Sequence, residues 1–329
     1  MPVTSAQNPP TPRVTDDFRG DFEAVAAMME DSWAGSVQPP QLYTPAFLQS
    51  WFDYPGMDHS LAPTIYEGST PVAFVAGFPR RVRLHGRERK LLVATFLPAA
   101  AEHKQKGYGI LAWSELVRRA REAGLDGVVN YCVEGEPMER MIVGACRRVR
   151  IPVVRAYSIQ YASKLLLGRP GPIVDEDGQA TADAFLRAAA PIADSVPLAR
   201  LWTAEEARWQ CTRAGAVVAR RGEDGRAGLV TGYVAELADR RRTACVFVDD
   251  VLWGELADEE KSRLVETFVR KATAAGARIA VLPRLGYADL GPFLVHGFRP
   301  SQRVVHMYLS VWSDPDMDAP VGAAYLDVF

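Results

Sequence analysis

The stretch Lys-Gln-Lys-Gly-Tyr-Gly, residues 104–109, decides the fold of this chain. It lies between an apolar run that ends at Leu97 and a run over residues 110–123 whose apolar side chains follow a helical period. Gly107 and Gly109 leave backbone N–H groups uncovered, the new helix adds unpaired donors of its own, and the two lysines add positive charge. These features predict a binding site for a pyrophosphate group.

The same residues resemble the motif of a known family. Lys104, Gly107 and Gly109 occupy the three defining places of Arg/Gln-x-x-Gly-x-Gly/Ala, the motif of the GNAT superfamily of acetyl-CoA-dependent N-acyltransferases. Lysine in the first place departs from this motif, and the gap after Pro98 is longer than is usual in the family. The resemblance implies that the loop binds the pyrophosphate of an acyl-CoA.

Two other interpretations of the glycines remain open. Gly107, Gly109 and Ala112 also fit Gly-x-Gly-x-x-Gly/Ala, the dinucleotide-binding fingerprint, which expects its first glycine directly after a strand. Here nine residues separate Leu97 from Gly107, and the preceding sequence indicates antiparallel hairpins. The third interpretation is a tight turn that binds no ligand. The spacing favours the acyl-CoA site over both.

Length and composition indicate a folded two-domain protein of balanced charge. The 329 residues exceed one ordinary core, and 38 Lys and Arg nearly balance 40 Asp and Glu, which argues against a nucleic-acid partner. The four cysteines lie far apart without the spacing of a zinc site or a disulfide framework, so no metal is expected. No stretch is apolar over the roughly 18 to 20 residues that span a membrane, and the start of the chain does not resemble a signal sequence. We therefore expect a cytoplasmic protein without a membrane partner.

The first half of the chain follows the GNAT order of elements. Asp16 or Asp17 is expected to cap a helix that runs to Asp31, and Thr44-Pro45 to open a second helix. Expected after these are strands over residues 64–66, 71–84 and 89–97, the glycine loop with its helix, a strand over 127–133, a helix from Pro137 and a strand over 153–164.

The second half looks like a copy of the first. Residues 117–124, Val-Arg-Arg-Ala-Arg-Glu-Ala-Gly, match residues 269–276, Val-Arg-Lys-Ala-Thr-Ala-Ala-Gly. At the same offset the two glycines of the loop fall on Glu259 and Lys261, so that carboxylates stand where phosphates need N–H groups and cations. We therefore expect the second copy not to bind CoA in this way.

The sequence thus predicts an α/β (α+β) protein of two tandem GNAT folds, each with a mixed, largely antiparallel central sheet flanked by helices. The expected divisions are a flexible leader, an N-terminal domain that binds acyl-CoA, a linker, a C-terminal domain with a degenerate CoA loop, and a tail. They cover residues 1–13, 14–167, 168–181, 182–313 and 314–329.

The resemblance also implies which residues bind the donor. In the family, two neighbouring central strands splay apart, the pantetheine arm lies between them, and a backbone N–H polarises the thioester carbonyl. Main-chain donors, not side chains, would then hold the tetrahedral oxyanion. Carried onto this chain, the cofactor contacts are Thr95, Phe96, Leu97, Lys104, Gln105, Lys106, Gly107, Tyr108, Gly109 and Ile110.

Candidates for proton transfer stand on and after the expected strand at 127–133. Asn130, Tyr131 and Glu134 are the candidate catalytic residues, and Tyr131 can return a proton to the departing CoA thiolate. Glu136 starts the next helix, and Val143 stands where the family most often carries a tyrosine on its fourth helix. Each candidate has a plain structural interpretation too, because Tyr131 fits a packing aromatic and the glutamates fit solvated loop acids.

These features predict an acyl-CoA-dependent N-acyltransferase, with acetyl-CoA or another acyl-CoA as donor and a small-molecule amine as acceptor. A homodimer is an open possibility. The alternatives are a non-catalytic acyl-CoA sensor or scaffold, favoured by the missing tyrosine, and a GNAT-fold aminoacyltransferase that uses charged tRNA. The latter would need a basic groove, which the balanced charge does not indicate.

Overall fold

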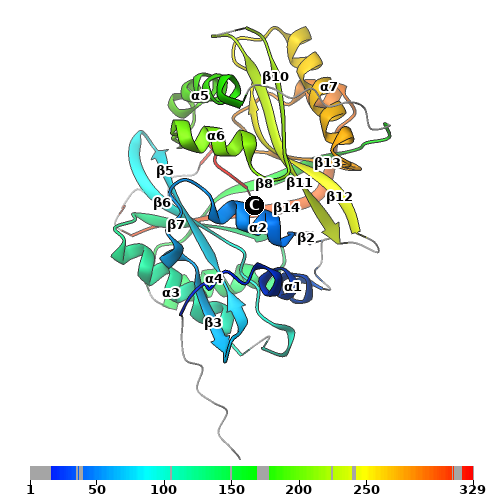
Figure 1. Cartoon of the computed structure of the whole chain (residues 1–329). Helices are drawn as coiled ribbons and strands as arrows, with labels where there is room; N and C mark the ends of the chain where they lie inside the picture. Colours follow the sequence, from blue (N-terminus) through cyan, green and yellow to red (C-terminus); the bar gives the residue numbers. More distant parts are fainter. Residues whose placement is uncertain are drawn as a thin grey trace, which may run out of the picture.

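The structure is a computed structural model that describes residues 16–34, 36, 40–103, 106–148, 150–168, 178–223, 225–238, 242–312, 314 and 321–328. One curled, mixed sheet runs through both halves, with helices packed along it, and β8 and β14 meet near the middle of the molecule (Figure 1). The strand order is β10-β11-β12-β13-β8-β14-β7-β6-β5-β9-β15, with β2 paired to β11, and a small separate sheet has the order β1-β3-β4. The expected fold class, mixed sheet with flanking helices, is confirmed.

The first half carries the helices that surround the glycine loop. Its elements are β1 (Asp16–Asp17), α1 (Phe22–Trp33), β2 (Gln41–Leu42), α2 (Pro45–Phe52), η1 (His59–Leu61), β3 (Pro63–Glu67), β4 (Thr70–Phe74), β5 (Ala76–Leu84), β6 (Arg87–Thr95), η2 (Ala101–His103), α3 (Tyr108–Glu122), β7 (Gly127–Val133), α4 (Pro137–Arg148) and β8 (Val154–Leu165).

The second half repeats this order with shorter connections. Its elements are α5 (Gly178–Ser195), β9 (Leu198–Arg200), α6 (Ala204–Thr212), β10 (Ala216–Arg221), β11 (Gly228–Ala238), β12 (Arg242–Leu252), α7 (Asp258–Ala274), β13 (Ile279–Arg284), α8 (Gly291–Val295), β14 (Arg299–Val311) and β15 (Ala324–Tyr325). Helix α5 begins inside the stretch expected as a linker, and β15 lies in the stretch expected as a tail.

Two expectations about the first half are wrong. Asp16 and Asp17 form β1, and the cap of α1 is Asp21, whose side chain accepts a hydrogen bond from the backbone N–H of Ala24. The strand expected over residues 71–84 is broken at Val75, because the Val75 N–H turns to the Pro63 carbonyl. As a result β4 joins the small sheet while β5 joins the large one.

Helices α3 and α7 confirm the repeat. Both end in the same way, with a glycine in the left-handed region (Gly124, φ 74°; Gly276, φ 89°). In both, the N–H after this glycine donates to the carbonyl five residues earlier, which is the hydrogen bond of a Schellman motif. They differ at the start, because α3 has 15 residues and α7 has 17. The glycine loop before α3 is thus replaced in the second half by additional helix that carries Asp258, Glu259 and Glu260 in its first turn.

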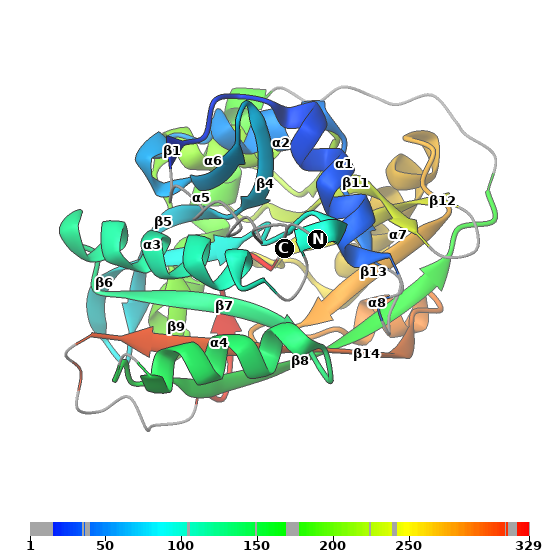
Figure 2. The same cartoon turned by 90° about the horizontal axis from the view of Figure 1, so that it is seen from below.

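The two halves exchange their last strands. Strand β8 of the first half pairs with β13, and β14 of the second half pairs with β7, so that β14 and β8 lie side by side in the middle of the sheet. Figure 2 shows β7, β14 and β8 running together, with α4 along them. Strand β14 therefore brings residues 305–311 of the second half to the sheet position beside β7.

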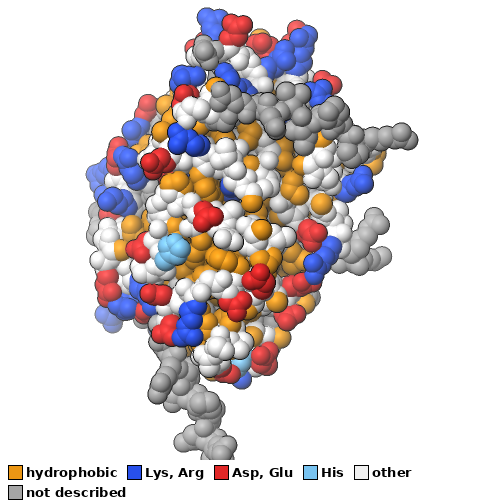
Figure 3. All heavy atoms as spheres, in the orientation of Figure 1, with side chains coloured by type: hydrophobic (Ala, Val, Ile, Leu, Met, Phe, Trp, Pro, Cys, Tyr) orange, Lys and Arg blue, Asp and Glu red, His pale blue; other side chains and the backbone are white. Residues whose placement is uncertain are grey.

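Aromatic side chains join the halves above this sheet. The rings of Trp51 and Trp209 are 4.8 Å apart, and those of Phe47 and Tyr233 are 5.0 Å apart, so that α2 packs on α6 and β11. In Figure 3 apolar side chains gather in the middle of this face, with acidic and basic side chains interspersed around them.

The C-terminal segment adds a buried ionic link between the halves. The Asp327 carboxylate accepts from Nε of Arg80 on β5 at 2.7 Å and lies 2.5 Å from Nη1 of Arg200 on β9. Burial disfavours the charged carboxylate, but Arg200 and Arg80 outweigh it and hold the pKa of Asp327 below its ordinary value.

Candidate active site

A cavity of about 690 Å³ lies where β6, β7, α3 and α4 meet, a volume within the usual range for small-molecule sites. Helix α1 and the segment around β2 close one side of it, and Arg303 of β14 reaches its wall. Of the residues expected to bind the cofactor, those on the cavity wall are Thr95, Phe96, Leu97, Gly107, Tyr108, Gly109 and Ile110.

The cavity lies over a wedge between two parallel strands. Strands β6 and β7 pair from Leu91 and Gly127 to Ala94 and Asn130, where the pairing ends. On its other edge β7 pairs with β14 along its whole length, whereas Phe96, just after β6, adopts a φ of 54°, a left-handed conformation that is uncommon for a residue other than glycine. This backbone irregularity turns the chain away from β7 and opens the wedge.

At one end of the cavity, α3 begins with uncovered backbone donors. Gly107 caps the helix at a φ of 85°, and the first helical bond runs from the Leu111 N–H to the Gly107 carbonyl at 3.0 Å. The N–H groups of residues 108–110 therefore have no acceptor within the helix. A Cβ atom built on Gly109 would meet nothing within 4 Å, so the second residue of α3 borders open space.

Lys106 and His103 lie together just before the start of α3. Lys104 and Gln105 lie outside the described residues. Lys106 is described, and its Nζ lies 3.3 Å from Nδ1 of His103. His103 is buried and lines the cavity, its ring stacks on Tyr108 at 5.2 Å, and its Nε2 lies 3.5 Å from a Glu67 oxygen. Sequence reasoning missed His103, because a lone histidine in an irregular stretch carries no motif.

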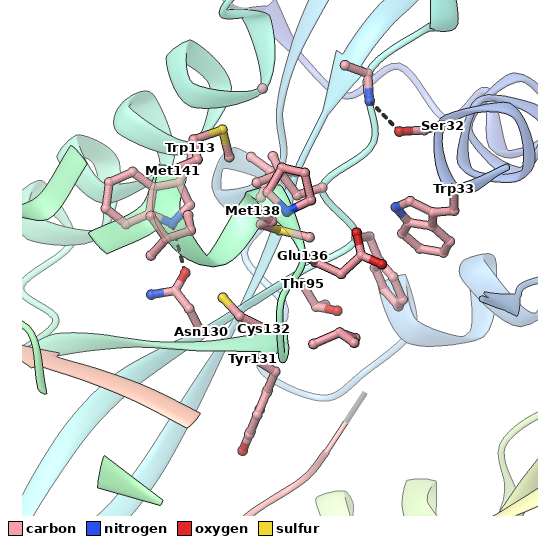
Figure 4. A pocket seen from close by; sticks show the side chains of 18 of the residues that line it. Ser32, Trp33, Thr95, Trp113, Asn130, Tyr131, Cys132, Glu136, Met138 and Met141 are labelled. Atoms are coloured by element: carbon pink, nitrogen blue, oxygen red, sulfur yellow. Dashed lines mark hydrogen bonds between the residues drawn. The ribbon is translucent and has the colours of Figure 1, made fainter. Parts of the chain in front are cut away.

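The side chains of β7 point alternately to its two faces (Figure 4). Asn130 and Cys132 face α3 and α4, where the Trp113 indole N–H donates to Oδ1 of Asn130 at 2.8 Å. Burial raises the pKa of the Cys132 thiol to about 12, so the thiol stays protonated at neutral pH. These contacts make this face of β7 a rigid wall.

Tyr131 points to the opposite face of β7 (Figure 4). Its hydroxyl oxygen is buried and has no hydrogen-bond partner among the residues that the structure describes. Burial raises the pKa of Tyr131 well above 10, so that the group is a neutral donor. A buried hydroxyl without a partner is uncommon, and the residue that carries it lines the cavity.

The two glutamates after β7 have different surroundings. Glu134 is absent from the cavity wall; its side chain is 57% exposed and lies 3.4 Å from Nε2 of His306, whose Nδ1 is 3.0 Å from the Ser158 hydroxyl. Glu136 lines the cavity, and in Figure 4 its carboxylate points across it toward Trp33. The exchange of β14 explains the difference, because it places His306 beside β7 where it can engage Glu134.

The comparison with solved structures identifies the fold. No family model matches the sequence, and no curated protein matches it. Crystal structures of Saccharomyces cerevisiae N-myristoyltransferase match nearly the whole chain. One, with bound myristoyl-CoA and inhibitors, has a TM-score of 0.70 at 13% identity and covers 98% of this chain and 87% of its own. Another, with bound myristoyl-CoA, has a TM-score of 0.71 at 12% identity and covers 99% and 92%.

The chain has the N-myristoyltransferase fold. At 12 to 13% identity the likeness concerns the fold alone. The N-myristoyltransferase fold consists of two GNAT units in tandem, so the expected architecture is confirmed. Strands of both units belong to one continuous sheet, so the fold needs the length of both halves. No helix within the described ranges is long and apolar enough to cross a membrane.

Proposed function

We propose that this protein is an acyl-CoA-dependent N-acyltransferase, which transfers an acyl group from CoA to an amine by direct attack on the thioester. One observation carries the proposal: the uncovered N-terminus of α3 and the wedge between β6 and β7 share a single cavity. A helix N-terminus favours a phosphate anion, and a wedge between strands offers main-chain groups to an extended arm.

For the donor, the N–H groups of residues 107–110 would bind the diphosphate, with Lys104, Gln105 and Lys106 next to it in the sequence. The pantetheine arm would run past Thr95, Phe96 and Leu97, and a main-chain N–H there would hold the oxyanion of the tetrahedral intermediate. We propose acetyl as the acyl group. The solved N-myristoyltransferases hold myristoyl-CoA, so chain length is the first property to test.

For the acceptor, we propose a small molecule with a primary amine. Tyr131 would return a proton to the CoA thiolate, because its hydroxyl is neutral and buried and has no hydrogen-bond partner among the described residues. Asn130, held by Trp113, would fix the wall beside the thioester. That Glu134 takes part in catalysis remains a prediction, which the 57% exposure of its side chain does not favour.

The direct test is thiol release from acetyl-CoA in the presence of spermidine, glycine, 2-phenylethylamine or a short peptide with a free N-terminus. We expect amine-dependent release with at least one small amine, and slower release as acetyl is replaced by octanoyl and myristoyl. Faster release with myristoyl-CoA, or with the peptide alone, would overturn the proposed acyl group or acceptor. Tight binding of acetyl-CoA without turnover on any acceptor would instead support the sensor.

A further inference from the structure

We infer that Glu136 is the catalytic base, the group that receives the ammonium of the acceptor and removes its proton. The inference rests on the proposed function and deepens it, because it places the acceptor amine between α4 and α1. It moves the acidic role from Glu134, the residue favoured by the sequence, to the glutamate two positions later.

The position of Glu136 comes from the start of α4. The Glu136 N–H donates to the Val133 carbonyl at 3.2 Å, which closes the turn after β7, and Pro137 then begins the helix. This turn aims the carboxylate across the cavity toward Trp33, near the C-terminal end of α1 (Figure 4). Among the described residues on the cavity wall, Glu136 is the one carboxylate.

The wall opposite Glu136 offers the indole of Trp33 to an organic cation (Figure 4), while Tyr43 beside it is near the positive charge of Arg303. The indole of Trp33 and the ring of Tyr43 pack edge to face with centroids 6.3 Å apart, and both line the cavity. A cation is attracted to the face of an aromatic ring, and a carboxylate on the other side adds a charge-assisted hydrogen bond. Together these groups favour a protonated amine as the form that enters the site.

Chemistry requires such a base. An amine with a pKa near 10 is about one part in a thousand unprotonated at pH 7, a deficit of roughly three powers of ten in rate. In the proposed step Glu136 takes one proton from the ammonium, directly or through water, and the nitrogen lone pair attacks the thioester carbon. The C–N bond forms and the C–S bond breaks; Tyr131 gives its proton to the CoA thiolate and regains one as the nitrogen loses its second proton, and Glu136 releases the first to solvent.

The other titratable groups of the cavity are less suited to this role. The Cys132 thiol and the Tyr131 hydroxyl both have raised pKa values and stay protonated. His103 is engaged by Lys106 and Glu67, at the phosphate end of the cavity. The remaining titratable and charged groups on the wall are Tyr43, Tyr108 and Arg303.

The test compares Glu136→Gln with Glu134→Gln, which removes the same charge from the rival candidate two residues away. Each variant is assayed with acetyl-CoA and every amine of the panel above, and its affinity for acetyl-CoA is measured by calorimetry. We expect Glu136→Gln to lower kcat by about 10² to 10³ at pH 7 with an acetyl-CoA Kd within about twofold of wild type. Glu134→Gln should lose much less activity than Glu136→Gln, and Glu136→Asp should recover part of the loss.

The pH dependence separates a base from a structural residue. As the pH rises from 7 to about 10, the acceptor becomes unprotonated by itself, so the deficit of Glu136→Gln should shrink by at least tenfold. A deficit that is constant with pH, a loss of acetyl-CoA affinity, or a larger defect in Glu134→Gln would overturn the inference while leaving the transferase intact. If wild type acylates no amine of the panel, the proposed function fails, and this inference fails with it.

Discussion

Replacing Gly109 by glutamate should strengthen the fold and destroy the donor site. Gly109 is the second residue of α3, a Cβ there meets nothing within 4 Å, and the backbone is not in the left-handed region. Removing a helical glycine and placing an acid in the first turn together stabilise a helix by about 1 kcal/mol. A carboxylate about 4 Å from a phosphate costs about 4 kcal/mol at an effective dielectric constant of 20, which corresponds to about 10³ in affinity.

Calorimetry with acetyl-CoA and thermal unfolding measure the two effects separately. We expect the melting temperature to rise by a few degrees and the affinity for acetyl-CoA to fall at least 10²-fold. The control is the reverse substitution at the second residue of α7, Glu259→Gly, which should lower the melting temperature and leave the affinity unchanged. An unaltered affinity in Gly109→Glu, or a lost affinity in Glu259→Gly, would refute the assignment of the donor to α3.

Three further substitutions test the buried groups around the site. Asp327→Asn should lower the free energy of unfolding by about 3 to 5 kcal/mol in urea denaturation, because it removes the carboxylate that lies between two buried guanidinium groups. The lowered pKa of Asp327 means that this contribution is complete above about pH 4 and is lost as the pH falls. An equal defect at pH 2.5 and pH 7 would contradict the ion pair. Burial raises the pKa of Glu206 to about 7, so wild type should lose stability as the pH rises from about 4 to 7. Glu206→Gln retains the capping geometry with Thr203 and should flatten this dependence of stability on pH. An unchanged dependence would disprove the protonated form of Glu206. Tyr131→Phe should alter the free energy of unfolding by less than about 0.5 kcal/mol, since the hydroxyl has no hydrogen-bond partner within the described chain. The same substitution should lower kcat at least tenfold. A stability loss without a kinetic effect would make Tyr131 a packing residue.

The local features of the donor site could be predicted from sequence because short-range rules govern them. A glycine in the left-handed region before an amphipathic helix, as at Gly107, can be read from residues that are neighbours in the chain. The same holds for the repeated end of α3 and α7 at Gly124 and Gly276. The conformation of these helix ends depends mainly on residues that are neighbours in the chain.

The partners of β7 could not be predicted in this way. An alternating strand pattern states which side chains share a face but not which strand lies next to it, and β8 and β14 are both suitable neighbours. The exchange of β14 brings His306 to Glu134 and Arg303 to the cavity, over more than 160 residues of chain. Sequence reasoning therefore favoured Glu134, whereas the structure turns Glu136 toward the cavity.

The tail illustrates the same limit. The composition after residue 313 gave no sign of structure, yet Ala324 and Tyr325 form β15 beside β9, and Asp327 is buried between Arg80 and Arg200. A short segment is ordered here by partners that are more than 120 residues away, which no local propensity encodes.

A crystal structure of the protein with acetyl-CoA tests the central claim most directly. The account predicts that the diphosphate lies against the backbone N–H groups of residues 107–110, with the pantetheine arm entering the wedge between β6 and β7. Density for the coenzyme at the start of α7, or elsewhere on the molecule with the α3 terminus unoccupied, would contradict it.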